Sequence, residues 1–229
     1  MKKFYLYMIA LIALPLVFTS CEDMMDDVNE DRNHTTEVPA KFILSDLITS
    51  TAFNAVGGDL STYFSTYSEL EVGTHNQLFN AEMRIGEPAR PATYNNTWGI
   101  LYSNIKNARI IVARCSDGGA QEGNYTTKGM GEVLLALNSA ILTDAFGDVP
   151  YFQAALPELK DGQPQFLNPK MDKQEAIYAE IFKLLDAAIV DLPKGDNHPS
   201  GSPLAFDFLY KSDTDSWVKL AKGLKARYL

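Results

Sequence analysis

The chain has 229 residues, of which 46% are hydrophobic and 21% charged, a composition that excludes a disordered or collagen-like protein. Its formal net charge of -9 opposes binding to the phosphate backbone of nucleic acids. Two cysteines are too few for a disulfide framework. The length and composition predict a globular module of about one domain.

The first twenty residues predict a lipoprotein signal peptide. Lys2 and Lys3 make a basic start, and the apolar run from Phe4 to Phe18 is short for a membrane-spanning helix. Small residues follow this run, and Cys21 stands where the chain becomes charged. The arrangement resembles the cleavage site of lipoprotein signal peptides, which lies before an acylated cysteine, although Phe18 replaces the usual leucine. The alternative is a conventional signal peptide over residues 1–20, followed by an incidental cysteine.

Residues 21–37 are expected to form a polar tether that begins at the acylated Cys21. Acidic residues from Glu22 to Asp27 resemble the surface-export signal of Bacteroidota lipoproteins. In enterobacteria an aspartate directly after the cysteine favours the inner membrane, and here that position is Glu22, so the sequence leaves the leaflet open. Two or three acyl chains would anchor the protein stably in membrane lipid, at ~0.8 kcal/mol per buried CH₂.

Alternating oxygen-bearing side chains from Asp27 to Asn33 have the spacing of a calcium-binding loop. Arg32 replaces the glycine that such a loop requires, and Val38 stands where a bidentate glutamate is needed. The segment from Asp213 to Asp215 fails in the same way. We therefore expect neither a bound metal ion nor another cofactor.

From residue 38 to residue 229 the dominant signal is an apolar residue every three or four positions, which predicts an all-α domain of six helices. The positions that mark these helices, in chain order, are Leu44, Ile48, Ala52 and Ala55; Leu60, Phe64, Tyr67 and Leu70; Trp98, Leu101, Ile105, Ala108 and Val112; Met130, Leu134, Leu137 and Ile141; Ile177, Ile181, Leu184, Leu185, Ala188 and Leu192; and Trp217, Leu220, Leu224 and Tyr228. Gly57 and Gly58 are expected to end the first helix, and Asp172 to Glu175 indicates a capping box before the fifth.

Three long connections separate these helices, over residues 73–96, 146–171 and 193–213, and loops of this length are usually functional or disordered. The third and fourth helices, and the fifth and sixth, make two pairs. Helix pairs are the repeating unit of tetratricopeptide-type stacks, although the strict repeat of ~34 residues is absent from this sequence. The last helix reaches Leu229 with no closing glycine, so we expect the chain to be the N-terminal part of a longer protein.

Five segments along the helical region carry a recognisable pattern. They run from Trp98 to Ala108, Leu142 to Tyr151, Gln174 to Tyr178, Leu185 to Ile189 and Trp217 to Arg227. The most specific stretch reads Thr-Asp-Ala-Phe-Gly-Asp-Val-Pro-Tyr and begins at Thr143. In this order, behind the lipid cysteine and an Asp-Val-Asn arm, they resemble the N-terminal part of a SusD/RagB-family outer-membrane lipoprotein over essentially the whole mature chain.

This resemblance implies a lipid-anchored protein of the outer membrane that faces the cell exterior and covers a TonB-dependent transporter. Such a protein would capture an oligosaccharide, or in some members a peptide, and deliver it to the transporter without breaking a bond. The implied fold is a tetratricopeptide-like helical scaffold whose ligand-binding side is built largely from loops and later sequence. The alternative is a helical scaffold subunit of the transporter complex that binds no ligand.

Aromatic and amide side chains between residues 73 and 97 are the candidates for ligand contact: His75, Asn76, Gln77, Phe79, Tyr94, Asn95 and Asn96. Sugar rings present C–H faces that stack on aromatic rings, while amides satisfy the sugar hydroxyls. The alternative is that Tyr94 packs on the loop and the amides cap the helix that follows. Members of the family do not share one set of binding residues, so the resemblance assigns none.

The sequence has no zinc-protease, serine-hydrolase or phosphate-loop motif, so no catalytic residue is expected. Asp144 and Asp148 are interpreted as part of a helix end, with Gly147 in the left-handed conformation, rather than as an acid/base pair. The paired carboxylates of a glycoside hydrolase are set by the fold and not by spacing, so the sequence alone leaves that possibility open.

Three residues with distinctive side chains are expected in the protein core. Trp98 and Trp217 lie on apolar helical faces, where core packing is the default over ligand stacking. Cys115 lies at the end of the third predicted helix, where a small apolar group is normally buried.

Overall fold

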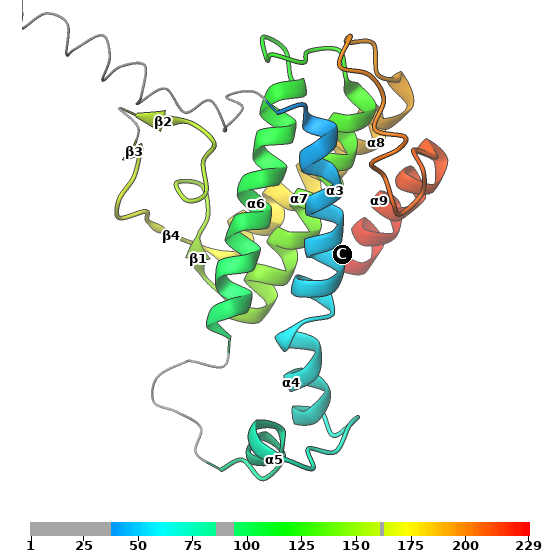
Figure 1. Ribbon diagram of the computed structural model, residues 1–229. Helices are drawn as coiled ribbons and strands as arrows, with labels where there is room; N and C mark the ends of the chain where they lie inside the picture. Colours follow the sequence, from blue (N-terminus) through cyan, green and yellow to red (C-terminus); the bar gives the residue numbers. More distant parts are fainter. Residues whose placement is uncertain (1–37, 86–93, 161–162) are drawn as a thin grey trace, which may run out of the picture. The chain divides into compact units, whose positions relative to one another are not determined.

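The computed structural model describes residues 38–85, 94–160 and 163–229, and Pro39–Leu229 forms one compact unit (Figure 1). The predicted signal peptide, Cys21, the tether and the Asp27–Asn33 segment lie outside the described residues. Among those described, no helix combines the length and the apolar character that crossing a bilayer requires.

The described part of the chain is mostly helical, as the periodicity predicted. The helices are α3 (Ala40–Ser50), continued by the π-helical turn η2 (Thr51–Val56), α4 (Asp59–Tyr67), α5 (Asn76–Glu82), α6 (Asn95–Cys115), α7 (Tyr125–Phe146), α8 (Gln174–Asp191), extended by the 3-10 turn η3 (Leu192–Lys194), and α9 (Thr214–Tyr228). Each of the six predicted helices is present, and the all-α fold class is confirmed.

The connection before α8 contains short strands that the sequence did not predict. Strand β1 (Val149–Pro150) pairs antiparallel with β4 (Met171–Asp172), and β2 (Leu159–Lys160) pairs antiparallel with β3 (Gln163–Pro164). Two residues are too few to show the apolar and polar alternation by which strands are recognised.

Two local predictions are wrong. Residues 76–82 were assigned to a loop but form α5, which buries only Ala81 and so lacks a repeated apolar pattern. The capping box before α8 is absent, because the N-cap residue is Lys173 and makes no side-chain capping bond. Instead Asp148 Oδ1 accepts a hydrogen bond from the Gln174 amide at 3.0 Å, while Asp172 Oδ2 accepts one from the Tyr151 amide at 2.9 Å.

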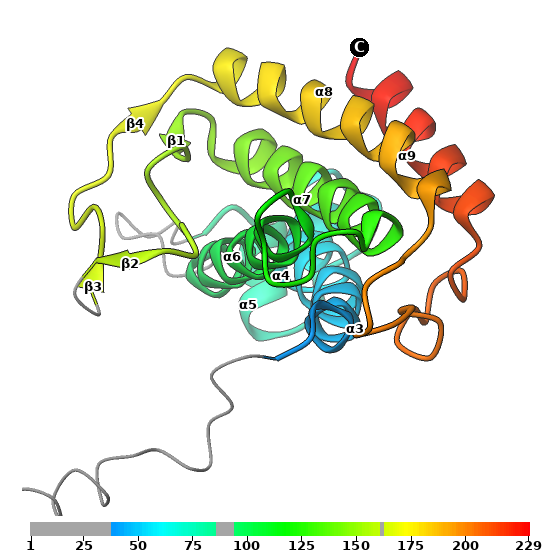
Figure 2. The same ribbon diagram turned by 90° about the horizontal axis from the view of Figure 1, so that it is seen from above.

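Helix α7 is central to the packing, between α6 and α8 (Figure 2). Two of its glycines permit close approach. A Cβ added at Gly131 would lie 2.7 Å from Ile111 Cγ2 on α6, and one at Gly129 would lie 2.7 Å from Leu192 Cγ in η3. The neighbouring segments therefore pack directly on the α7 backbone, a contact that larger side chains would prevent.

Buried polar side chains add specific ties between helices. The Asn138 side chain on α7 accepts a hydrogen bond from Asn104 Nδ2 on α6 at 3.0 Å and donates one to Thr51 Oγ1 at 2.9 Å. Because buried polar groups are costly unless paired, these bonds fix how α6, α7 and η2 align.

The segment before α9 is organised by one buried carboxylate, that of Asp207, which is 1% exposed. Its Oδ1 accepts bonds from the amides of Leu209 and Tyr210, at 2.9 and 3.1 Å. Its Oδ2 accepts bonds from the Ser212 amide at 2.7 Å and from Trp217 Nε1 at 2.8 Å. Trp217 is fully buried, which confirms its predicted place in the core.

The Cys115 thiol is also fully buried, as predicted. Burial raises the pKa of this thiol to about 12, so it is an unreactive small apolar group rather than a nucleophile. In contrast, Trp98 is 37% exposed and packs on Tyr102 and Phe146 with ring centroids 4.9 and 5.0 Å away, so its prediction as a core residue is wrong.

Charged side chains of α7, α8 and η3 cluster together, and one of them, the buried carboxylate of Glu132, is incompletely paired. Glu132 is 3% exposed, its Oε1 lies 3.5 Å from Lys128 Nζ, and its Oε2 has no hydrogen-bond partner within the described part of the chain. Lys128 is bound more closely to Asp191, at 2.7 Å, and Asp191 also pairs with Lys194 at 2.5 Å. Burial raises the pKa of the Glu132 carboxyl to about 7, against the opposing charge of Lys128.

We predict that Gly131→Ala lowers the free energy of unfolding by about 1–3 kcal/mol, because the new methyl group overpacks against Ile111. The matched control is Gly223→Ala on α9, where an added Cβ meets no atom within 4 Å. This control should instead raise stability by about 0.5–1 kcal/mol, the usual gain of alanine over glycine in a helix. Urea unfolding followed by tryptophan fluorescence measures both. Equal stabilisation by the two substitutions would contradict close packing at Gly131.

We also predict a pH-dependent effect of Glu132→Gln. The Glu132 pKa rises from its ordinary 4.5 to about 7 on folding, so its favourable contribution is complete below pH 4.5 and is lost as pH rises through 7. The variant should therefore gain stability relative to the parent protein between pH 4.5 and pH 8.5, by roughly 3 kcal/mol. Unfolding at both pH values tests this. Glu175→Gln, which changes an exposed carboxyl on α8, is the control, and a flat Glu132→Gln difference would refute the raised pKa.

Candidate functional site

Aromatic side chains gather where α4 and α5 meet the first turn of α6. The rings of Tyr63 and Tyr94 lie 5.8 Å apart in an edge-to-face arrangement, and those of Phe64 and Tyr94 lie 5.9 Å apart. Tyr67 stacks beside Tyr63 with a centroid separation of 6.4 Å. We refer to Tyr63, Phe64, Tyr67 and Tyr94 as the aromatic cluster.

Helix geometry explains how a short element presents three of these rings. Tyr63 and Tyr67 are four residues apart on α4, so they lie on the same face, and Phe64 is the adjacent residue. Within α4 only Leu60 and Thr66 are buried, so the aromatic side chains are left toward the surface. Phe64 is 47% exposed.

Polar groups attach α5 and its neighbouring turn to this cluster. Tyr63 Oη donates a hydrogen bond to Gln77 Oε1 at 3.0 Å. Arg84 donates to the Tyr67 carbonyl at 2.9 Å, and its guanidinium carbon lies 5.2 Å from the centre of the Tyr67 ring. Aromatic faces beside amide and guanidinium donors suit a ligand with apolar C–H faces and hydroxyl groups.

The chain segment that carries most of the cluster also exposes several large hydrophobic side chains. Large hydrophobic side chains are exposed along most of the segment from η2 to the end of the α5 region: Phe53, Val56, Phe64, Leu70, Val72, Phe79, Met83 and Ile85. Contiguous exposed apolar surface on a folded protein commonly marks a binding site or an interface.

The ligand candidates that the sequence predicted are divided between three places. Gln77 and Tyr94 both contact Tyr63, so they belong to or adjoin the aromatic cluster. His75, Asn76 and Gln77 line a hollow of about 580 Å³ on α5, the α5 hollow. Phe79 is exposed on the same helix.

Asn95 and Asn96 line a different hollow, of about 560 Å³, at the first turn of α6, which we call the α6 hollow. The alternative that these amides cap α6 is wrong for Asn96, which donates to Asp59 Oδ2 at 3.3 Å. Tyr94 is the N-cap residue and makes no side-chain capping bond. Its packing against other aromatic rings agrees with the alternative proposed for that residue.

Sequence reasoning missed Tyr63 and Arg84 and assigned Phe64 and Tyr67 to a buried helical face. The available signal was the clustering of three aromatic residues within five positions of a short helix with a single aliphatic residue, Leu60. Arg84 had no such signal, because its contacts with Tyr67 join residues that are seventeen positions apart.

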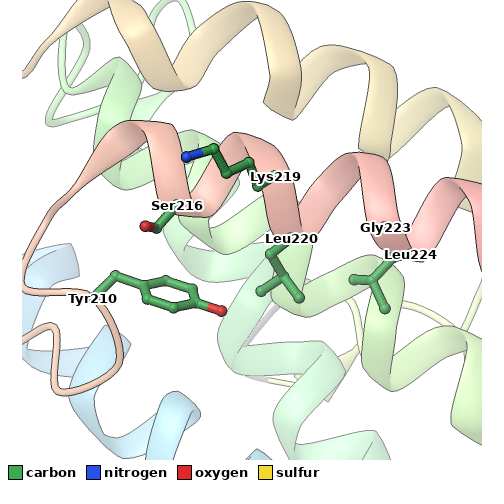
Figure 3. A pocket seen from close by; sticks show the side chains of 6 residues that line it. All are labelled: Tyr210, Ser216, Lys219, Leu220, Gly223 and Leu224. Atoms are coloured by element: carbon green, nitrogen blue, oxygen red, sulfur yellow. The ribbon is translucent and has the colours of Figure 1, made fainter.

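A third hollow, of about 440 Å³, lies beside α9 and has a different character (Figure 3). The ring of Tyr210 and the side chains of Leu220 and Leu224 border the same space, with Lys219 and Ser216 at its edge. It offers neither amides nor exposed stacking faces on both sides, so its chemistry fits an apolar packing partner better than a polar ligand.

The two aspartates at the end of α7 hold the structure together. Gly147 has φ 73° and ψ -130°. The positive φ that favours glycine is present as the sequence predicted, but the ψ differs from that of a left-handed helical residue. Asp144 accepts a hydrogen bond from the Tyr178 hydroxyl, and Asp148 pairs with Lys173 at 2.6 Å. The hydrogen bond from Lys173 lowers the pKa of Asp148. Both carboxylates therefore secure the start of α8, in agreement with their structural interpretation.

Comparison with solved structures identifies the fold. The crystal structure of a SusD/RagB family protein from Bacteroides thetaiotaomicron VPI-5482 is 48% identical, with a TM-score of 0.76, over 84% of this chain and 38% of that chain. A chitin-binding protein is 24% identical, with a TM-score of 0.61, over 83% of this chain and 38% of that one, and this likeness concerns the fold alone. The present chain thus spans 38% of the length of either protein.

No curated protein matches the chain. The sequence model of a SusD-like family, described as "Starch-binding associating with outer membrane", matches residues 32–229. This match covers nearly all of the described helical unit and agrees with the 48% identity to the SusD/RagB family protein. The chain belongs to the SusD-like family.

Proposed function

We propose that this protein is a nutrient-binding lipoprotein of the cell surface, which captures an oligosaccharide and delivers it to a TonB-dependent transporter of the outer membrane. The aromatic cluster is the observation that carries the proposal. It combines the exposed ring of Phe64 and three half-buried tyrosine rings with the side chains of Gln77 and Arg84. The family description, which names starch binding and the outer membrane, supports a glycan over a peptide as the ligand.

The physical basis of capture is stacking. Phe64 is 47% exposed and is held in position by Tyr94, so it offers a ring face that needs little ordering when a sugar binds. The hydroxyl groups of that sugar would exchange hydrogen bonds with the amide of Gln77 and the hydroxyl of Tyr63.

The proposed role involves no bond cleavage. Carboxylates near the cluster already accept hydrogen bonds that organise the local chain. Glu71 Oε2 accepts a bond from Ser65 Oγ at 2.8 Å, and Glu82 Oε2 accepts one from the Gly73 amide at 3.2 Å. This engagement supports a binding site over a pair of catalytic acids.

We infer that acylated Cys21 anchors the protein in the outer membrane, facing the cell exterior, and that residues 21–37 form the tether. The helical unit would then pack on the transporter. A scaffold subunit without a ligand is the alternative, and the binding experiment below separates the two functions.

We predict that Phe64→Ala weakens oligosaccharide binding about tenfold, because a lost stacking face is worth roughly 1–2 kcal/mol. Phe208→Ala is the matched control, since Phe208 is 66% exposed and lies between α8 and α9. Calorimetry and affinity electrophoresis of the full-length protein against starch oligosaccharides, chitin oligosaccharides and short peptides would measure binding. Reducing ends and cleaved peptides are assayed alongside.

The expected result is saturable binding to an oligosaccharide, unaffected by Phe208→Ala and without released product. Saturable binding to peptides alone would replace the glycan by a peptide. No binding across the panel, together with co-purification of the transporter, would favour the scaffold function. Released product would overturn the non-catalytic function.

We predict that Cys21→Ser moves the protein from the membrane to the soluble fraction, because the acyl chains that hold it are lost. Mass analysis of the parent protein should show an acylated Cys21. External proteinase should digest the parent protein on intact cells. An unmodified cysteine would refute the lipid anchor, and protection until the cells are permeabilised would refute surface exposure.

A further inference from the structure

The α6 hollow is a separate polar cavity beside the aromatic cluster. It lies between the first turn of α6 and the segment from the end of α3 to the start of α4, and measures about 560 Å³. Most of its lining residues carry hydrogen-bonding side chains, and none is aromatic: Ser50, Asn54, Asp59, Asn95, Asn96, Thr97 and Ser103 are the polar ones. Ligands in such a cavity would be recognised by hydrogen bonds and not by stacking.

Thr97 provides an unused hydrogen-bonding group in this wall. The residue is 1% exposed, and its Oγ1 has no hydrogen-bond partner among residues 38–85, 94–160 and 163–229. A buried hydroxyl without a partner carries a free-energy penalty. Ligand binding at the hollow would remove that penalty if the ligand supplied the missing hydrogen bond.

The first turn of α6 contributes donors of a second kind. The helix runs from Asn95 to Cys115, and its first amide N–H groups have no acceptor within the helix. Its N-cap residue, Tyr94, makes no side-chain capping bond. Both Asn96 and Thr97, in this first turn, line the hollow. Acceptor oxygens of a ligand would therefore be favoured here.

The carboxylate of Asp59 favours a neutral ligand over an anion. It lines the same hollow and accepts the hydrogen bond from Asn96 at 3.3 Å. A full negative charge there opposes a second anion, whereas the helix end alone would favour one. A neutral ligand rich in hydroxyl groups satisfies both, because a hydroxyl accepts from N–H donors and donates to a carboxylate.

The position of the hollow connects it to the aromatic cluster. Asp59 and Tyr63 are four residues apart on α4 and so lie on one face, while Tyr94 and Asn95 are consecutive. A sugar chain stacked on the cluster would therefore extend toward the hollow.

We propose that the α6 hollow is a second subsite, which binds one neutral sugar unit by hydrogen bonds next to the unit stacked on the aromatic cluster. The proposal rests on the proposed glycan capture for the class of ligand, but its residues are different. It makes the ligand that fills both places an uncharged oligosaccharide of at least two units, of which a single unit suffices to occupy the hollow.

Two substitutions test the hollow without disturbing the fold. Thr97→Val keeps the shape of the side chain and removes the unpaired hydroxyl, so the melting temperature should stay unchanged or rise. Gly99→Leu places a side chain in the hollow from a position where an added Cβ meets no atom within 4 Å. Phe208→Ala is the control, since Phe208 is 66% exposed and is not among the residues that line the hollow.

The experiment is a titration of ¹⁵N-labelled full-length protein with D-glucose, N-acetyl-D-glucosamine and sodium sulfate, monitored through the amide signals of Gly58, Thr97 and Gly99. We expect either sugar to shift these signals saturably and sulfate to leave them unchanged. Thr97→Val should weaken the sugar response about tenfold, Gly99→Leu should abolish it, and Phe208→Ala should preserve it.

Several results would overturn the proposal. Shifts caused by sulfate and not by the sugars would make the hollow an anion site. A sugar response that survives both Thr97→Val and Gly99→Leu would locate binding elsewhere, and the absence of any response would leave the hollow without a ligand. Failure of the proposed function looks different, because oligosaccharide binding would then be insensitive to Phe64→Ala while the signals of the hollow still respond to sugar.

Discussion

Close packing against α7 is the constraint on which the rest of the helical unit depends. Gly131 lets Ile111 of α6 approach the α7 backbone, and Gly129 does the same for Leu192 at the end of α8. Both contacts bring neighbouring helices nearer than any larger side chain would permit. Asn138 then adds directional hydrogen bonds to α6 and η2, so the helices are held in alignment as well as in contact.

The proposed binding side is built differently from this core. Helix α4 buries only Leu60 and Thr66, and α5 buries only Ala81. Here ring contacts and side-chain hydrogen bonds, such as the one from Tyr63 to Gln77, replace extensive apolar burial. A rigid helical scaffold that presents a less buried, aromatic-rich end is a common way to separate the requirements of stability from those of binding.

The two parts also use polar groups in opposite ways. In the core, Asp207 accepts four hydrogen bonds, two on each oxygen, and so organises the segment that leads to α9. Glu132 is the exception, because burial raises the pKa of its carboxyl and its Oε2 has no hydrogen-bond partner in the described part of the chain. At the α6 hollow, the buried Thr97 hydroxyl also has no partner among the described residues, but Thr97 is one of the residues that line the cavity. The proposed sugar would supply the missing hydrogen bond there, whereas the Glu132 carboxyl lies within the packing of α7 and lowers stability above neutral pH.

The sequence by itself determined the helices whose apolar residues repeat over several turns, the end of α7 at Gly147, and the resemblance that led to the family. These features depend on neighbours within a few positions. Only the tertiary structure decided that Asp148 caps α8 from another segment, that Tyr63, Phe64 and Tyr94 form one cluster, and that Thr97 lines a cavity beside Asp59. Asp59 and Asn96, for instance, are thirty-seven positions apart, and no local periodicity records a contact over that separation. Such contacts exist because α3, η2 and α6 pack on α7 and on one another, while α4 in turn contacts both η2 and α6.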